Sequence, residues 1–333
     1  MTNRRRAPRP GSPVQQGLFG PLDPDPRDAP AVAPFAVAEA IRELAAALPD
    51  RLRLGTSSWT FPGWRGIVYA EGTAQRLLAR HGLDAYARHP LLSAVGIDRT
   101  FYAPIAAADF AAYAAAVPER FRFLVKAWAE VTSPTTREQQ GHNPRYLDVA
   151  STTELVVAPA LQGLGSRLGP LVFQFPPQGA AVTRRPEAFA DALHAFFSRL
   201  PRGVHYAVEL RDEALLTARY VQALAASSAR HCFSVHPRMP SIARQRELVP
   251  IDGPIAVRWM LHRGLDYEQA KARYEPFDRI VDADPTNRTE IAALCDAALT
   301  LGVPVTVVVN NKAEGSAPLS VLELARQLVT HVR

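Results

Sequence analysis

The sequence predicts an α/β protein, a (β/α)8 TIM barrel of eight parallel strands that follows a disordered N-terminal arm. Eight short runs rich in β-branched and aromatic residues alternate with longer stretches rich in Ala, Leu and Arg. This alternation is typical of βαβ units in a parallel sheet, and eight strands are the number that closes a TIM barrel. A length of 333 residues suits one such barrel with additions.

The N-terminal arm is predicted from its composition. Residues 1–34 contain eight prolines and begin with the basic segment RRRAPR at 4–9. A stretch of this kind cannot bury enough apolar surface to offset the entropy lost when it becomes ordered. We therefore expect residues 1–34 to be a disordered Pro/Arg-rich arm and residues 35–333 to form a single barrel domain.

The order of the elements follows from the same alternation. The strand-like runs lie at 51–59, 92–102, 120–128, 170–176, 205–211, 231–237, 255–261 and 303–311. Helices are expected at about 35–48, 73–88, 106–116, 145–165, 186–199, 214–228, 266–282, 287–301 and 317–331. The segment 239–254 is expected to be a long loop instead of a full helix. An open, doubly wound sheet is the alternative, but no G-x-G-x-x-G motif follows the first strand.

The strand-like runs have two faces of different character. Successive side chains of a strand point to opposite sides, so one set should face the helices and the other the barrel interior. In the run 205–211, apolar Tyr206 and Val208 alternate with Glu209 and Arg211. The polar members of the predicted interior set are Asp98, Lys126, Gln174, Glu209, Arg211, His236, Arg258, His262 and Asn310.

These interior charges need partners, because a buried unpaired charge costs several kcal/mol. One interpretation is an interior ion-pair network that neutralises Glu209. The other is a ligand site at the carboxyl ends of the strands, where TIM-barrel enzymes have their active sites. Three cations (Lys126, Arg211 and Arg258) beside one carboxylate favour an anionic ligand, and Arg can bind phosphate or carboxylate with two parallel hydrogen bonds.

Roles follow for the candidate site residues. Lys126 is the candidate nucleophile or base, including for Schiff-base chemistry, and Glu209 is the candidate general acid/base. Arg211 and Arg258 are expected to bind the anion. The residues expected to orient the ligand are Gln174, Asn310, Asp98, Tyr102 and Trp59. Aromatic side chains near the strand ends would either stack on a base or sugar or pack the loops over the barrel mouth.

Neither a cofactor nor a metal site is expected. Asp98, Glu209, His236 and His262 are too few for a site of two or three metals, and each His is better explained as a single hydrogen-bonding residue. The two cysteines, Cys232 and Cys295, lack zinc-site spacing and are expected to be reduced, buried thiols of a cytoplasmic protein. No apolar run is long enough to span a membrane, so no membrane partner is expected.

Several motifs resemble those of the YecE-like family, also known as domain of unknown function 72 (DUF72). They run in family order across most of 52–333: LGTSSWTFPGWRGIVY, IDRTFYAPI, RFRFLVKAWAEVTSP, LGPLVFQFPPQ, AVELR, AVRW and VVVNN. The resemblance implies a TIM barrel but no particular reaction. Barrels of this family look similar to those of the endonuclease-IV and xylose-isomerase types, which is an analogy of fold alone.

The sequence departs from the family pattern at two places. The family motif usually reads V-E-I-N-S-T-F-Y, whereas Gly96 replaces the Glu and Asp98 stands at the Asn position. After AVELR the family usually continues with His and Trp, whereas this chain has Asp212 and the residues that follow it. Asp98 is two residues beyond Gly96 and therefore on the same strand face, where it would partly replace the lost carboxylate.

We therefore expect an enzyme that acts on a phosphate-bearing or other anionic substrate, with an anionic small molecule or a nucleic acid as the partner. The net charge of +6 is compatible with both partners. Two alternatives remain: a non-catalytic module that binds nucleic acid or another anionic ligand, and a metal-dependent phosphodiesterase of the endonuclease-IV type. No protein partner is indicated.

Overall fold

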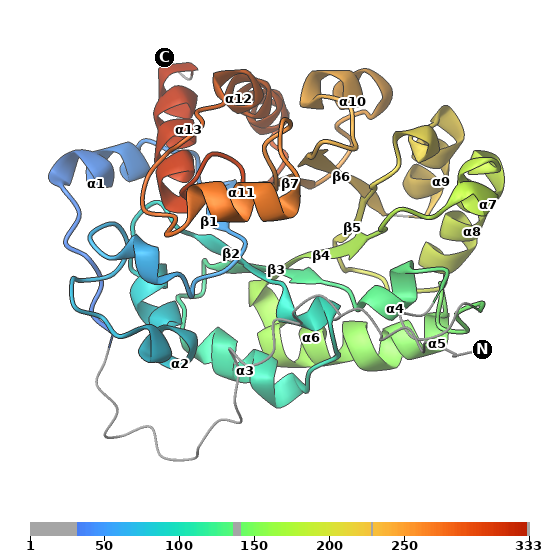
Figure 1. Cartoon of the computed structure of the whole chain (residues 1–333). Coiled ribbons are helices and arrows are strands. Elements are labelled where there is room, and N and C mark those ends of the chain that lie inside the picture. Colours follow the sequence, from blue (N-terminus) through green and yellow to red (C-terminus); the bar gives the residue numbers. More distant parts are fainter. Residues whose placement is uncertain (1–31, 136–140, 228, 332–333) are drawn as a thin grey trace, which may run out of the picture.

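Eight parallel strands form one closed barrel in the order of the sequence (Figure 1). The computed structural model describes residues 32–135, 141–227 and 229–331. The strands are β1 Leu52–Thr56, β2 Ala94–Ile97, β3 Arg122–Lys126, β4 Leu168–Gln174, β5 Tyr206–Glu209, β6 Arg230–Val235, β7 Ile255–Trp259 and β8 Val305–Val309. Pairing of β1 with β8 closes the ring. The predicted TIM barrel is thus confirmed, and each of the eight predicted runs overlaps one strand, although β4 and β6 begin before their predicted runs.

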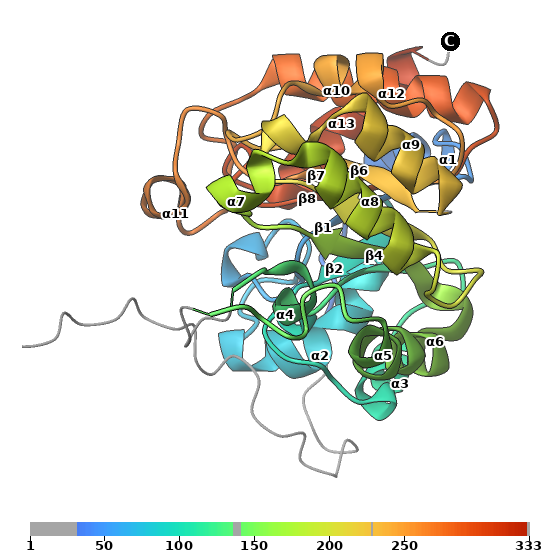
Figure 2. The ribbon, with the colours of Figure 1, turned by 90° about the vertical axis from the view of Figure 1, so that its right-hand side faces the viewer.

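The helices surround this barrel, as Figures 1 and 2 show. They are α1 Glu39–Ala46, α2 Gln75–Ala87, α3 Ala107–Ala115, α4 Ala129–Thr132, α5 Val149–Thr152, α6 Ala158–Leu164, α7 Ala180–Thr183, α8 Pro186–Phe197, α9 Ala218–Ala226, α10 Ile242–Leu248, α11 Tyr267–Tyr274, α12 Pro285–Thr300 and α13 Ala317–His331. A π-helical turn at Thr153–Val157 joins α5 to α6. Among the helices of the described ranges, none is both long and apolar enough to cross a membrane.

Two of the expected elements differ in the structure. The expected loop at 239–254 contains helix α10, whose N-cap Ser241 accepts a hydrogen bond from the Arg244 amide. A helix of seven residues is too short for a clear apolar period, so the sequence pattern did not reveal it. The helix expected at 266–282 ends at Tyr274, because Pro276 follows and the residue before a proline disfavours helical backbone.

The predicted arm can be compared with the structure only at its end, since residues 1–31 lie outside the described residues. Residues 32–34 pack on the barrel domain instead of forming part of a disordered arm. Val32 is buried, Pro34 forms an antiparallel bridge with Tyr69, and the Ala70 amide donates to the Ala33 carbonyl. This backbone pairing is not visible in composition alone.

Two cores lie on opposite sides of the sheet. The larger core fills the space between strands and helices, and it contains the apolar set that was predicted to face the helices. A smaller apolar layer crosses the barrel interior: Leu124, Val172, Ala207, Cys232, Ala256 and Val308. Two residues further along the same six strands, the side chains become polar: Lys126, Gln174, Glu209, Ser234, Arg258 and Asn310. The strand period therefore places a polar layer directly above an apolar floor, at the carboxyl ends of the strands.

Candidate functional site

The polar layer is organised around the carboxylate of Glu209, the last residue of β5. Its Oε2 accepts a hydrogen bond from Arg258 Nη1, and its Oε1 lies 2.5 Å from Arg211 Nη2. All three side chains are buried, with 0% of Glu209, 1% of Arg258 and 7% of Arg211 exposed. Although burial alone would raise the pKa of Glu209, the two guanidinium groups lower it to about 2.

Arg258 connects this ion pair to two further predicted residues. Its Nη1 also donates to Gln174 Oε1 at 3.3 Å, and its Nη2 lies 3.4 Å from Asp98 Oδ1. Burial opposes the charge of Arg258, but Glu209 and Asp98 outweigh that effect and raise its pKa. The Asp98 side chain is 34% exposed, so this carboxylate, unlike Glu209, is in contact with solvent.

Lys126 is the most unusual charged residue of the layer. Only 8% of it is exposed, and its Nζ lies 3.6 Å from the centre of the Phe101 ring. Across the described parts of the chain, its ammonium group has neither a hydrogen-bonding side chain nor an ion-pair partner. Burial, assisted by Arg258 and opposed by Asp98, lowers the pKa of Lys126 from 10.5 to about 8.

Several polar atoms of this layer are buried and lack a hydrogen-bond partner among the described residues. They are Arg211 Nη1, Arg258 Nε, Ser234 Oγ and Glu209 Oε1, the last of which is still in ion-pair contact with Arg211. Buried donors of this kind are normally satisfied by protein, water or ligand atoms.

The rim of the site contains residues that the sequence analysis did not identify. Lys312, which follows β8, is 6% exposed, and its Nζ lies 4.0 Å from the centre of the Tyr267 ring and 5.6 Å from that of Phe277. Burial lowers the pKa of Lys312 to about 8. Tyr267 begins α11, a helix that Figure 2 shows standing apart from the other helices on one side of the molecule. Tyr102 is exposed, and its phenol raises the pKa of Tyr267 in addition to the larger effect of burial.

The structure brings together six of the predicted residues: Asp98, Lys126, Gln174, Glu209, Arg211 and Arg258. Asn310 and Trp59 are engaged in other contacts. Asn310 donates to Ser57 Oγ at 2.8 Å and accepts from the Lys312 amide, so it joins the β8 turn to the end of β1. Trp59 is 4% exposed and packs edge-on against Tyr113 of α3, with the ring centres 5.3 Å apart.

The two histidines predicted to lie at the strand ends make local contacts. His236 Nδ1 accepts from the Arg238 amide, and His262 Nδ1 accepts from the Gly264 amide. Each therefore stabilises the turn that follows its strand. Within the described ranges, no three His, Cys, Asp or Glu side chains lie together as they would to hold a metal ion.

Both cysteines are buried and free, as expected. Cys232 belongs to the apolar floor of the barrel, whereas Cys295 lies in α12.

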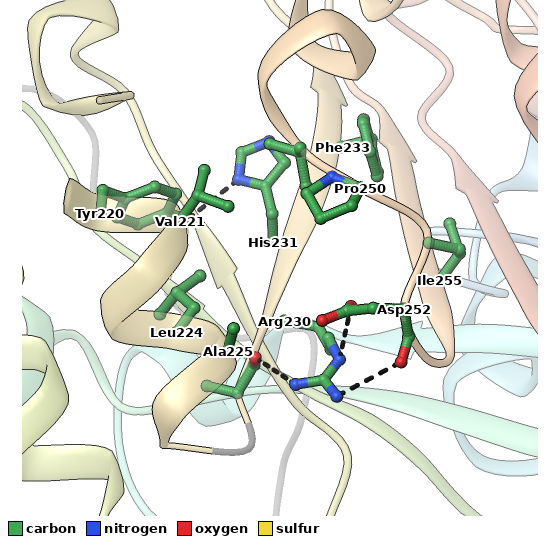
Figure 3. A pocket seen from close by; sticks show the side chains of 12 residues that line it. Tyr220, Val221, Leu224, Ala225, Arg230, His231, Phe233, Pro250, Asp252 and Ile255 are labelled. Carbon is green, nitrogen blue, oxygen red and sulfur yellow. Dashed lines mark hydrogen bonds and ion pairs between the residues drawn. The ribbon is translucent and has the colours of Figure 1, made fainter. Parts of the chain in front are cut away.

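Cavities also lie away from this layer. Figure 3 shows one between α9 and the starts of β6 and β7, where His231 is hydrogen-bonded to Tyr220 and Arg230 is paired with Asp252. Its volume of about 20 Å³ is sufficient for one water molecule. Another, of about 460 Å³, is lined by residues 34–37, Arg42, Arg88, Pro90 and Arg120. Its lining includes residues just before β2 and β3, so it lies at the opposite end of the barrel from Glu209.

Comparisons with known proteins agree with the barrel. The family model described as "Protein of unknown function DUF72" matches residues 53–333. A solved DUF72 family protein (TM1631) from Thermotoga maritima MSB8 is similar in structure, with a TM-score of 0.54, 20% sequence identity and coverage of 83% of this chain and 98% of that one. Another (EF0366), from Enterococcus faecalis V583, gives a TM-score of 0.53, 20% identity and coverage of 83% and 95%. No curated protein matches the sequence.

Replacing Glu209 by Gln tests its role as the shared partner of two guanidinium groups. We expect E209Q to lose about 3–5 kcal/mol of unfolding free energy at pH 7, because the change leaves buried cations uncompensated. The folded-state pKa of about 2 lies below the usual 4.5, so the stabilisation is present above pH 4.5 and is lost as the pH falls towards 2. Urea unfolding at pH 7 and pH 3 measures both effects.

The matched control is E247Q, which breaks the exposed Arg244–Glu247 pair and should change stability by less than about 0.5 kcal/mol. A loss in E209Q that is no larger than the loss in E247Q would contradict the assigned role.

Replacing Lys126 by Met tests whether its buried charge destabilises the fold. We expect K126M to be more stable than wild type at pH 7, by up to about 3 kcal/mol, because the ammonium group has no ion pair. Between pH 8 and 10.5 the unfolded state binds more protons than the folded state, so the unfolding free energy of wild type rises over that range. The stabilities of wild type and K126M should therefore become equal near pH 10.5. Urea unfolding at pH 7 and pH 10 measures the difference, with K271M at an exposed lysine as control. Lower stability of K126M at pH 7 would contradict the prediction.

Proposed function

This chain belongs to DUF72, a family of proteins of unknown function, and from the geometry of its barrel mouth we propose that it is an enzyme that acts on a substrate carrying a phosphate or other anionic group. The active site is the polar layer at the carboxyl ends of the strands. The chemistry of individual side chains supports this proposal, because the fold itself is shared by proteins with many different activities.

One observation carries the proposal: the layer holds more buried positive charge than its carboxylates neutralise. Three cations, Lys126, Arg211 and Arg258, are accompanied by the two carboxylates of Glu209 and Asp98. Both carboxylates are paired with arginine, which leaves the Lys126 ammonium as the charge without a counter-ion among the described residues. A bound anion would supply that counter-ion and would also accept hydrogen bonds from Arg211 Nη1, which now has no partner among the described residues.

The proposal assigns different work to the two carboxylates. Glu209 is fully buried, bound on both oxygens and strongly acidic, so it orients the guanidinium groups and compensates their charge. Asp98 is partly exposed and has a longer contact with Arg258, so it is better able to exchange a proton with a substrate. Gln174, which accepts a hydrogen bond from Arg258, helps to orient the same guanidinium.

The depth of the site favours a small ligand over a nucleic acid. Lys126 and Arg258 are 8% and 1% exposed, so a phosphate must enter the barrel to reach them. Cations that contact a nucleic-acid backbone lie on an accessible surface instead. A metal-dependent phosphodiesterase gains no support from the described residues, where no ligand cluster was found.

Anion binding tests the proposal directly. At constant ionic strength, replacing chloride by inorganic phosphate should raise the melting temperature of the wild-type protein, because the anion binds only the folded state. We expect K126M to bind phosphate at least about tenfold more weakly, because it loses a charge-assisted hydrogen bond. Calorimetric titration measures the affinity.

The matched control removes a cation that lies outside the site. R219Q breaks an exposed ion pair with Asp191 and should bind phosphate as wild type does. Equal affinities of wild type and K126M would show that the anion does not bind at this layer. No binding of phosphate or of a small carboxylate such as acetate would overturn the proposal.

A further inference from the structure

Lysine is rare in this chain, and its placement is uneven. Three of the 38 basic residues are lysines, at 126, 271 and 312. Lys271 is exposed on α11 and lies 4.0 Å from Glu275, as an ordinary surface lysine does. The other two, Lys126 and Lys312, are buried at the carboxyl ends of the strands. In a protein that uses arginine for almost every cation, two of its three lysines therefore lie at the candidate site.

This placement indicates a chemical need that arginine cannot meet. Both side chains provide positive charge, and arginine is the better ligand for phosphate or carboxylate. Arginine, however, does not lose its proton in proteins, whereas a buried lysine can. A site that required only charge would be served by arginine, which already occupies positions 211 and 258.

The surroundings of Lys126 meet the requirement for a neutral amine. Its Nζ rests on the Phe101 ring and, among the described residues, has no carboxylate within ion-pair distance to hold its proton. The nearby guanidinium groups of Arg258 and Arg211 add to the effect of burial, whereas the carboxylates of Asp98 and Glu209 oppose it without reversing it. About a quarter of such an amine is neutral at pH 7.5, compared with about 0.1% of a lysine with an ordinary pKa of 10.5.

We propose that Lys126 is an amine nucleophile that forms an imine with the carbonyl carbon of a small anionic aldehyde or ketone, whose carboxylate or phosphate group is held by Arg211 and Arg258. This inference rests on the proposed anionic substrate and names its class. The carbonyl group places the electrophilic carbon next to Lys126, and the anionic group occupies the hydrogen-bond donors that lack partners.

The reaction balances without an oxidant, a reductant or a second substrate. The lone pair of neutral Nζ attacks the carbonyl carbon, a C–N bond forms, and the oxygen takes up a proton that the nitrogen releases. The carbinolamine then loses its hydroxyl group as water, with a proton delivered to the oxygen, and the nitrogen lone pair forms the C=N bond of a protonated imine. Asp98, which is partly exposed and interacts with Lys126 through its charge, is the group that carries these protons.

The neighbouring side chains also distinguish Lys126 from Lys312. Lys312 rests on Tyr267 at the rim, and the charges acting on it come from Lys271, from the acidic residues Glu268 and Glu275 and, more weakly, from Asp98. No arginine of the polar layer is among its charged neighbours, so a bound carbonyl compound would not be directed towards it.

Reductive trapping tests the proposal on the full chain. The protein is incubated separately with glyoxylate, pyruvate and pyridoxal 5′-phosphate, then treated with sodium borohydride, which reduces an imine to a stable secondary amine. Intact mass and peptide mapping locate the adduct. We expect one adduct per chain, on Lys126, with formation that is competed by inorganic phosphate and that rises with pH around a midpoint near 8.

Two substitutions serve as controls. K126R keeps the positive charge but cannot form an imine, so it should bind phosphate and give no adduct. K271R, at the exposed lysine of α11, should give the wild-type adduct. K126M provides a second variant without the amine if K126R does not fold, as judged by circular dichroism.

The outcomes separate the two proposals. Phosphate binding without an adduct on Lys126 for any of the three probes would overturn imine formation and leave the anionic substrate in place. An adduct that appears equally on exposed Lys271, or that persists in K126R, would also overturn it. Absence of both phosphate binding and trapping would remove both proposals.

Discussion

The buried carboxylate of Glu209 determines the arrangement of charge in this barrel. It sits directly above an apolar floor, and two arginines from the ends of β5 and β7 turn inward to meet it. Removing such groups from water is costly, and their mutual attraction offsets that cost only because each oxygen has a close partner. Because both oxygens of Glu209 already have arginine partners, the proposed ligand would meet Lys126 and the partly exposed Asp98, whose contact with Arg258 is longer. A barrel whose interior is filled with Val, Ile and Leu up to the carboxyl ends of its strands would have no such charged side chains there.

The fold could be predicted from the sequence to the extent that its signals are local and periodic. The alternation of Tyr206 and Val208 with Glu209 separates the two faces of β5 without knowledge of any other strand. Elements that depend on a capping residue or on pairing with a distant segment were harder to predict from the sequence. Helix α10 depends on a Ser241 cap and on buried Gln245, which hydrogen-bonds to the backbone of Ser234. The backbone pairing of Pro34 with Tyr69 joins segments that no local pattern connects.

The candidate site, like the fold, could be predicted from the sequence only in part. Strand parity predicts that Lys126, Glu209 and Arg258 point inward, but parity cannot say which charges pair and which remain. Trp59 lies three residues beyond the end of β1, where the strand period no longer governs direction, and it packs against α3. Lys312 and Tyr267 meet because the chain after β7 returns to the barrel mouth, a path that periodicity does not encode. The scarcity of lysine was the one sequence signal that would have drawn attention to Lys312.

The close approach of β1 and β2 explains why the partly exposed carboxylate is at position 98 and not at position 96. At Gly96 an added Cβ atom would lie 3.0 Å from the Ser57 carbonyl oxygen, so a larger side chain there would require the two strands to separate slightly. Asp98, two residues nearer the mouth, avoids this constraint and still reaches Arg258 at 3.4 Å. Asp98 therefore lies at the level of Lys126, where solvent also reaches it, and not at the level of the apolar floor. A carboxylate in that place can carry the protons that the proposed reaction of a shielded amine requires.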